Sequence, residues 1–407
     1  MGYTGVAIKG ATWISAFRIS TRLLSFVKIA VLARVLSPAQ FGVFGIASLV
    51  LAFLEILTET GINILLVQSK KGIEEYVNSA WVVSILRGFI IASLIIISSP
   101  LISSFFNSPE SLGILMLISF VPLIRGFINP AIASFQKELK FKYEFWFRTS
   151  VFFVDGLVSV ALAVMTMSVY SLAWGLLAGA VFEVLLSFIV VKSRPRFELQ
   201  KEYFREIFHK GKWVTMYGVF NYISENGDDV MVGKIIGTPA LGLYQMAYKI
   251  SILPISEVSD VVSRVVFPVY TKMAEDKDRL FKAFFKTITS ISLVSVLVGL
   301  VIFLYSKEII EFVLGNQWVS ASPVLKVLAL YGVLRTISGP ASALFLSLGK
   351  QNYVFLMTSF RLLGLLLSIY PLILLYGLIG AAYAQVISVI IELPVILFFV
   401  FRLYKKL

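Results

Sequence analysis

The sequence of 407 residues contains no cysteine and only one histidine, His209. The missing thiols exclude disulfide bonds, thiolate metal sites and cysteine nucleophiles. A metal cluster built on imidazole ligands and a Ser/His/Asp triad are not expected from a single histidine. We therefore predict no catalytic residues and no metal site.

Charged residues are also scarce, at 14% of the chain, whereas 58% of the residues are hydrophobic and 14% are aromatic. The mean hydropathy is +0.89. This composition leaves too little polar surface to cover a water-soluble protein of this length. No polar stretch is long enough for a separate soluble domain, so we expect one helical membrane domain without an appended enzyme.

Apolar stretches long enough to cross a bilayer as a helix recur about twelve times. Few turn or breaker residues separate them, so their ends are set only approximately by the sequence. The predicted spans are 12–35, 42–66, 78–99, 113–135, 148–168, 171–192, 213–235, 240–268, 283–304, 322–347, 353–375 and 378–401. The predicted fold class is an all-α polytopic membrane protein.

Lysine and arginine collect in the connections that follow even-numbered spans. Connections after odd-numbered spans contain only Lys307, with Arg34 and Lys234 at helix ends. Because positive residues mark the cytoplasmic side, both termini are predicted to be cytoplasmic, in the inner membrane of a cell. The net charge of +13 is then a signal of topology and not of nucleic-acid binding.

The first apolar stretch is interrupted by Arg18, Arg22 and Lys28 and has no A-x-A cleavage site. We therefore expect it to be retained as a helix and not removed as a signal peptide. The basic connection at 193–212 also contains several aromatic residues. It fits an amphipathic segment on the membrane surface or a solvated linker equally well.

Two pairs of segments indicate an internal repeat. VLARVLSPAQFGVFGIA at 31–47 aligns with MVGKIIGTPALGLYQMA at 231–247, and LIRGFINPA at 123–131 aligns with VLRTISGPA at 333–341. The pairs have the same order and nearly the same offset, which predicts a duplicated unit of six helices. Because six is even, the two copies are parallel repeats, expected to enclose a central cavity. The predicted domains are a lobe at 1–192, a cytoplasmic linker at 193–212 and a lobe at 213–407.

Many charged residues lie inside the predicted spans, where each costs about 2.5–3.5 kcal/mol near the bilayer centre. The first span has a polar face, within an arc of about 140°, made of Ser15, Arg18, Thr21, Arg22, Ser25 and Lys28. An anionic diphosphate would explain so many cations, because arginine binds phosphate oxygens bidentately. The candidate substrate-binding cations are Arg18, Arg22, Lys28, Arg87, Arg125, Lys249, Arg264, Arg335 and Arg361.

The alternative interpretation is that acids and bases pair between helices and only fix their packing.

Intramembrane acids also allow coupling of transport to a proton or sodium gradient, because burial shifts the pKa of a carboxylate. The candidates for this role are Glu55, Glu59, Glu225 and Asp228. No bound cofactor is expected.

The sequence resembles the Wzx-type polysaccharide exporters of the MOP superfamily, especially the colanic and teichuronic acid exporter branch. The resemblance covers nearly the whole chain, and its most typical stretches are LARVLSPAQFGVFGIA, GINILLVQ at 61–68, NGDDVMVGKIIGTPALGLYQMAYKISILP at 226–254 and VVFPVYTKM at 265–273. It implies a two-lobed flippase that moves an undecaprenyl-diphosphate-linked oligosaccharide to the outer leaflet by alternating access. It also implies contact with membrane lipid, and with a polysaccharide polymerase and export machinery as partners.

Two other functions compete with this interpretation. A cation-coupled multidrug exporter of the same superfamily would place acids in its cavity, and acids are present on the second and seventh spans. An integral-membrane glycosyltransferase or polymerase would need catalytic groups in a sizeable external loop. The longest predicted external connection is near 304–322 and is short, so we expect no enzyme.

Overall fold

The computed structural model describes residues 3–59, 61–62, 66, 73–198 and 200–405, without the side chains of residues 3–11, 14–15, 73, 201–214, 217, 253, 256–265 and 277. The chain forms two compact units, residues 1–223 and 224–407. All regular structure in the described part is helical. This confirms the predicted all-α class. The proposed division at 193–212 stays a prediction, and helix α10 (Lys201–Ile235) begins within that range.

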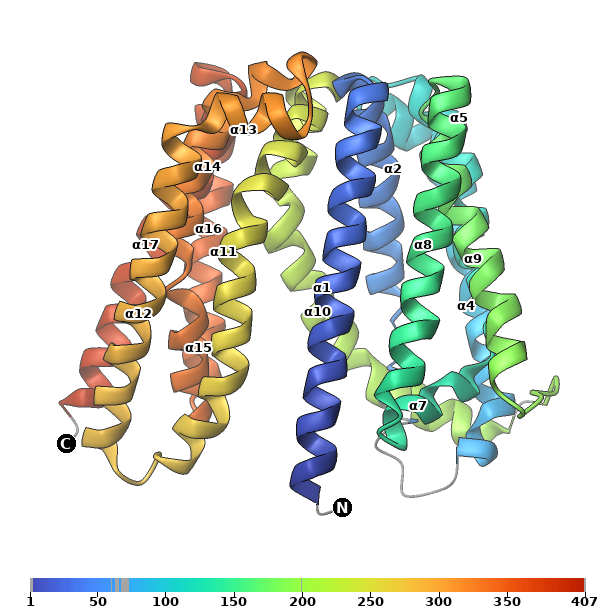
Figure 1. Ribbon diagram of the computed structural model, residues 1–407, viewed down its shortest axis with the longest axis horizontal. Coiled ribbons are helices and arrows are strands. Elements are labelled where there is room, and N and C mark those ends of the chain that lie inside the picture. Colours follow the sequence, from blue (N-terminus) through green and yellow to red (C-terminus); the bar gives the residue numbers. More distant parts are fainter. Residues whose placement is uncertain (1–2, 60, 63–65, 67–72, 199, 406–407) are drawn as a thin grey trace. The chain divides into compact units, whose positions relative to one another are not determined.

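The first unit contains helices α1 to α9 and the part of α10 up to Ile223 (Figure 1). Helix α8 packs against both α1 and α9, and α6 packs against both α4 and α9. The bounds are α1 (Tyr3–Val35), α2 (Pro38–Leu57), α4 (Ile73–Phe105), α5 (Glu110–Ile118), α6 (Phe120–Arg125), η1 (Pro130–Ala133), α7 (Ser134–Lys137), α8 (Phe141–Thr166) and α9 (Tyr170–Val190).

The second unit begins within α10. Helix α17 packs along α16 and also contacts α14 and α15. The bounds are α11 (Thr238–Lys272), α12 (Lys277–Leu304), α13 (Ser306–Val313), η2 (Asn316–Ala321), α14 (Ser322–Arg335), α15 (Ser338–Ser347), α16 (Gln351–Tyr376) and α17 (Leu378–Tyr404).

The first repeat motif marks the same feature in both units, the start of a helix after a tight turn. Ser37 caps α2, and its side chain accepts from the amide of Gln40 while the Gln40 side chain accepts from the amide of Ser37. Pro38 follows at the first position of the helix, where a missing N–H costs nothing. In the second unit Gly237, with φ +108°, precedes α11. Glycine suits this turn because other residues rarely adopt that conformation.

The second repeat motif lies at breaks within the fourth and tenth predicted spans. Helix α6 ends at Arg125, and the chain bends by 72° before η1 and α7. Helix α14 ends at Arg335, and α15 starts at Ser338. Each motif carries a proline shortly after its arginine, which disfavours an unbroken helix. Both breaks therefore place an arginine at a helix end inside an apolar segment.

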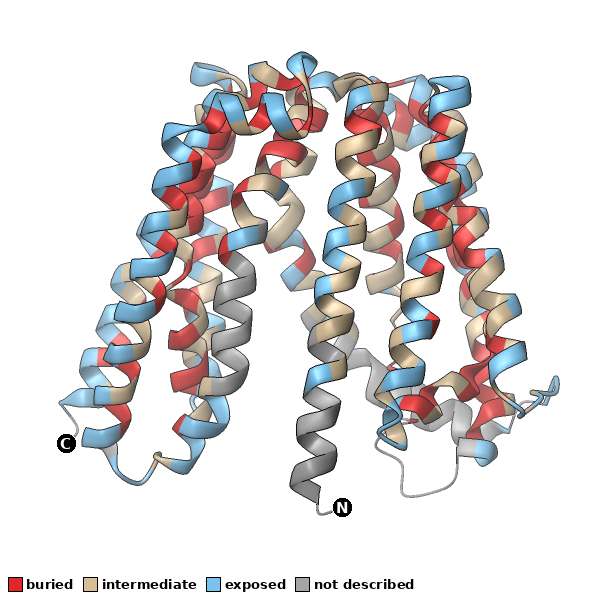
Figure 2. Cartoon of the chain, viewed as in Figure 1, coloured by how far each residue is buried: buried red, intermediate tan, exposed pale blue. Residues whose placement is uncertain are grey.

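Eight helices in the described part are long and apolar enough to span a membrane, or nine if the bent segment is one span. Helices α1, α10 and α11 are not among them. The predicted count of twelve stays a prediction, although each predicted span overlaps a helix. Large apolar side chains such as Ile97, Leu367 and Ile189 are more than 70% exposed. Buried and exposed positions alternate along the helices of each unit (Figure 2), as expected where the outer faces contact lipid.

Candidate functional site

The cations of α1 lie along the described part of that helix. The side chain of Arg22 is exposed and that of Arg18 is partly exposed. Thr21, between them, donates its hydroxyl to the carbonyl of Phe17 at 2.8 Å. This local bond satisfies a polar group within the helix itself. The two guanidinium groups, one helical turn apart, are therefore the main polar feature of this stretch.

Lys28, two turns further along α1, forms an ion pair with Asp155 of α8. The Lys28 Nζ lies 2.8 Å from both carboxylate oxygens of Asp155. Ser159, one turn along α8, donates to Asp155 Oδ1 at 3.3 Å. The Asp155 residue is 9% exposed. The pair therefore joins α1 to α8 in a partly desolvated environment.

Two glycines of α9 make room for this pair. A Cβ atom at Gly175 would lie 2.7 Å from the carbonyl oxygen of Asp155 and would overlap Ser159 Oγ. A Cβ atom at Gly179 would lie 3.0 Å from the Cβ of Asp155. Helix α9 thus approaches α8 closely because these positions lack side chains, and the small residues bring the two helices together.

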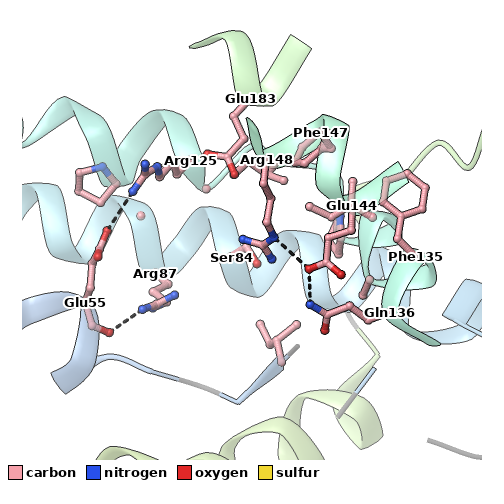
Figure 3. Close-up of a pocket in the computed structure, with 18 of the residues that line it drawn as sticks. Glu55, Ser84, Arg87, Arg125, Phe135, Gln136, Glu144, Phe147, Arg148 and Glu183 are labelled. Atoms are coloured by element: carbon pink, nitrogen blue, oxygen red, sulfur yellow. Dashed lines mark hydrogen bonds and ion pairs between the residues drawn. The ribbon is translucent and has the colours of Figure 1, made fainter. Parts of the chain in front are cut away.

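A second ionic cluster connects α2, α4, α6 and α9 of the first unit (Figure 3). Arg125, at the end of α6, lies 3.8 Å from Glu55 Oε1 and 3.4 Å from Glu183 Oε2. Arg87 donates to the backbone carbonyl of Glu55 at 2.5 Å and lies 3.4 Å from Glu59 Oε2. The helix break at Arg125 brings its guanidinium between two carboxylates from different helices.

One side of a cavity of about 280 Å³ is lined by four of these residues, Glu55, Arg87, Arg125 and Glu183. On the other side, Glu144 Oε1 accepts from Arg148 Nε at 3.0 Å and from Gln136 Nε2 at 2.6 Å. Phe135 and Phe147 form part of the wall beside them (Figure 3). The cavity is thus bordered by ionic groups on both sides and by two aromatic rings.

In the second unit, Glu225 of α10 accepts from two arginines. Arg335 donates to both of its carboxylate oxygens, and Arg361 of α16 donates to Oε1 at 3.1 Å. Arg335 also donates to the hydroxyl of Tyr331 at 2.5 Å. Bidentate pairing of this kind fixes the geometry of both side chains. Glu225 is therefore the meeting point of α10, α14 and α16.

Two further acids of this unit are almost fully buried. Asp228, 1% exposed, accepts from Tyr244 Oη at 2.7 Å and from Gln385 Nε2 at 2.5 Å through Oδ2. Glu392, 0% exposed, accepts from Ser338 Oγ at 3.1 Å. In the described part of the chain, Asp228 Oδ1 and Glu392 Oε1 have no hydrogen-bond partner.

The structure brings some of the predicted residues together and separates others. Arg87 and Arg125 share a cluster with the predicted acids Glu55 and Glu59, and Arg335 and Arg361 share Glu225. Lys28 lies apart from both clusters, on Asp155. Lys249 is exposed on α11. The side chain of Arg264 lies outside the described residues.

Three acids were missed by sequence reasoning. The structure pairs Asp155 with Lys28 and Glu183 with Arg125, and it places Glu392 against Ser338. Each is an isolated acid in an otherwise apolar predicted span. The rule that an intramembrane ionisable residue has a partner would have found all three. Among the described residues no group of three metal-ligating side chains is present.

Comparison with known proteins supports the membrane exporter interpretation. The chain is 25% identical over 398 residues to the teichuronic acid biosynthesis protein TuaB of Bacillus subtilis, covering 94% of this chain and 80% of that protein. It is 23% identical over 367 residues to the lipopolysaccharide biosynthesis protein WzxC of Escherichia coli, covering 87% and 72%.

Solved structures show the same fold. The lipid II flippase MurJ in an inward closed conformation superposes with a TM-score of 0.77 at 18% identity, over 95% of this chain and 87% of that one. An inward-facing multidrug MATE transporter of the MOP superfamily superposes with a TM-score of 0.72 at 16% identity, over 95% of each chain. These structures confirm the predicted fold. Residues 31–323 match the polysaccharide biosynthesis protein family, and the chain, a multi-pass membrane protein, belongs to that family.

Proposed function

We propose that this protein is a flippase that moves a lipid-linked oligosaccharide, carried on undecaprenyl diphosphate, from the cytoplasmic to the outer leaflet by alternating access. Relatives of the family are named for teichuronic acid and lipopolysaccharide biosynthesis, and the fold is that of flippases and multidrug transporters. These names supply the substrate class. The activity is transport without catalysis, with both termini and the 193–212 connection on the cytoplasmic side.

The cations of α1 are the observation that carries this proposal. Arg18 and Arg22 present two partly or fully exposed guanidinium groups on adjacent turns of a helix. A diphosphate offers several acceptor oxygens that such groups bind bidentately. We therefore assign the diphosphate to Arg18 and Arg22.

The second unit holds the strongest candidates for coupling to a proton or sodium gradient. Asp228 is buried with one oxygen unpartnered among the described residues, whereas Glu225 is committed to two arginines. A buried acid with an unpartnered oxygen is a candidate for binding a proton or a sodium ion, because unsatisfied buried groups cluster at functional sites. Glu55 and Glu59 remain candidates in the first unit.

The multidrug exporter is less well supported. Such a function needs acids that attract a cationic drug, but Glu225, Glu55 and Glu59 all lie within 4 Å of guanidinium groups. An acid that is already neutralised by a neighbouring cation attracts a second cation weakly. The cationic face of α1 would in addition repel the drug.

The test is flipping of a diphosphate-linked oligosaccharide by purified protein in vesicles. Arg18→Ala with Arg22→Ala should reduce the rate by tens to hundreds of fold, since truncating a desolvated charge contact costs about 2–4 kcal/mol. The matched control is Arg194→Ala with Arg196→Ala, which removes two exposed cations from the connection after α9. Wild-type flipping by a well-folded α1 double variant would reject the assignment.

A further inference from the structure

The cavity of the first unit has a charge balance that distinguishes it from the cationic face of α1. Its described lining includes three carboxylates and three guanidinium groups, so the formal charges cancel. The carboxylates are Glu55, Glu144 and Glu183, and the guanidiniums are Arg87, Arg125 and Arg148. A diphosphate would bring net negative charge into a site that offers no net positive charge. The balance therefore favours an uncharged ligand.

The ionic groups nevertheless keep unused hydrogen-bonding capacity. Arg125 lies 3.4 Å from Glu183 and 3.8 Å from Glu55, and its Nε has no hydrogen-bond partner among the described residues. The buried Nε therefore keeps a donor that a ligand can satisfy. A hydroxyl suits the position because it accepts from the guanidinium and donates to the carboxylate at the same time.

The opposite wall offers the same alternation of donors and acceptors. Glu144 and Arg148 face the cavity with Gln136, and the three side chains hold one another through hydrogen bonds (Figure 3). Phe135 and Phe147 are less than 10% exposed and add a rigid apolar surface. Planar polar groups beside aromatic rings complement a ring that has hydroxyls at its edge and C–H groups on its faces.

We propose that this cavity binds an uncharged sugar ring of the transported glycan, an inference that rests on the proposed flippase function. The volume of about 280 Å³ suits a group of one or two rings and not a long oligosaccharide. The site thus selects the sugar, while the α1 cations hold the diphosphate. Arg125 and Glu183 are the residues that contact the sugar hydroxyls.

Protection of a single cysteine tests this proposal directly, because the chain has no native cysteine. Ser84 lines the cavity, so Ser84→Cys would be labelled with a small maleimide in purified protein. The probes are glucose, galactose and N-acetylglucosamine, compared with sodium pyrophosphate at equal ionic strength. Lys350→Cys, exposed in the second unit, is the control position.

At least one neutral sugar should slow the labelling of Ser84→Cys saturably, with half-protection at about 1–10 mM, the range of a few hydrogen bonds. Pyrophosphate should leave the rate unchanged, and no probe should protect Lys350→Cys. Protection by pyrophosphate alone, or by none of the probes, overturns the proposal.

A charge-balanced variant separates binding from folding. Arg125→Gln with Glu183→Gln removes one cation and one acid, so the net charge of the lining is unchanged. It should lose the protection by sugar, whereas Arg402→Gln at the end of α17 should keep it. Retained protection in the double variant would remove these two residues from the site and contradict the proposal.

Flipping by the wild-type protein in vesicles distinguishes the two claims. Flipping without sugar protection rejects the sugar site and leaves the proposed function intact. Sugar protection without flipping of a diphosphate-linked oligosaccharide rejects the proposed function and leaves the binding site intact.

Discussion

The ion pair between Lys28 and Asp155 allows structural and substrate-binding roles to be separated. Its Nζ–Oδ1 distance is 2.8 Å, and the side chains are 19% and 12% exposed. Removing one member of a fully buried pair costs about 3–5 kcal/mol because the other charge stays buried without a partner. The remaining exposure allows some solvent screening. We therefore expect Asp155→Asn and Lys28→Met each to cost about 2–3 kcal/mol of unfolding free energy.

This loss corresponds to a change of roughly 30- to 150-fold in the unfolding equilibrium. It can be measured by unfolding the purified protein in mixed micelles with increasing SDS. The charge-reversed double variant, Lys28→Asp with Asp155→Lys, should recover most of the loss, because the same two helices are joined again. The exposed pair of Glu138 and Lys140 is the control, and Lys140→Met should leave stability unchanged.

Flipping by the same variants decides between the two roles. If Lys28 only ties α1 to α8, the charge-reversed protein should transport at close to the wild-type rate. If Lys28 contacts the diphosphate, reversal restores stability but not transport, because an acid then occupies the cationic face. Unchanged stability in both single variants would refute the structural interpretation of this pair.

Three further predictions follow from the other contacts. Gly175→Ala should destabilise the protein by about 1–3 kcal/mol in the same SDS titration, because the new methyl meets Asp155. Gly227→Ala is the control and should not destabilise it, because among the described residues its methyl meets no atom within 4 Å outside the local helix backbone. Glu225→Gln should cost about 2–3 kcal/mol, because two guanidinium groups lose their acid while partial exposure screens the charges, and an unchanged midpoint would contradict this. Ser193→Cys should resist an impermeant thiol reagent added outside intact cells, and labelling there would reverse the predicted topology.

Much of the fold could be predicted because length and hydropathy are local properties of the sequence. Each predicted span overlaps a helix, and the all-helical class is confirmed. The breaks after Arg125 and Arg335 were not predicted, since the repeat motif was used only to align the two halves. A proline shortly after an intramembrane arginine was the available signal.

The pairing of charges was beyond the reach of the sequence. The face of α1 that carries Lys28 was predicted to be polar, but its partner Asp155 is 127 residues away. Periodicity tells which residues share a face of a helix and not which helix packs against it. The pairing of Arg335 and Arg361 with the same acid, Glu225, could not be predicted either, because it depends on the packing of three helices.

The two units use the same link between corresponding helices with opposite polarity. In the first unit the cation Lys28 lies on the first helix of the repeat and the acid Asp155 on the fifth. In the second unit the acid Glu225 lies on α10 and the cation Arg361 on α16, which hold the corresponding places in the predicted six-helix repeat. Both arrangements join the helices equally well, because an ion pair does not depend on which helix carries which sign.

The two units differ in the charges that the first helix of each carries besides the pair. Helix α1 carries further cations at Arg18 and Arg22, and α10 carries further acids. Under the proposed function, α1 is suited to the phosphates of the substrate and α10 to a coupling cation, so the two helices that correspond in the predicted repeat would serve different ligands.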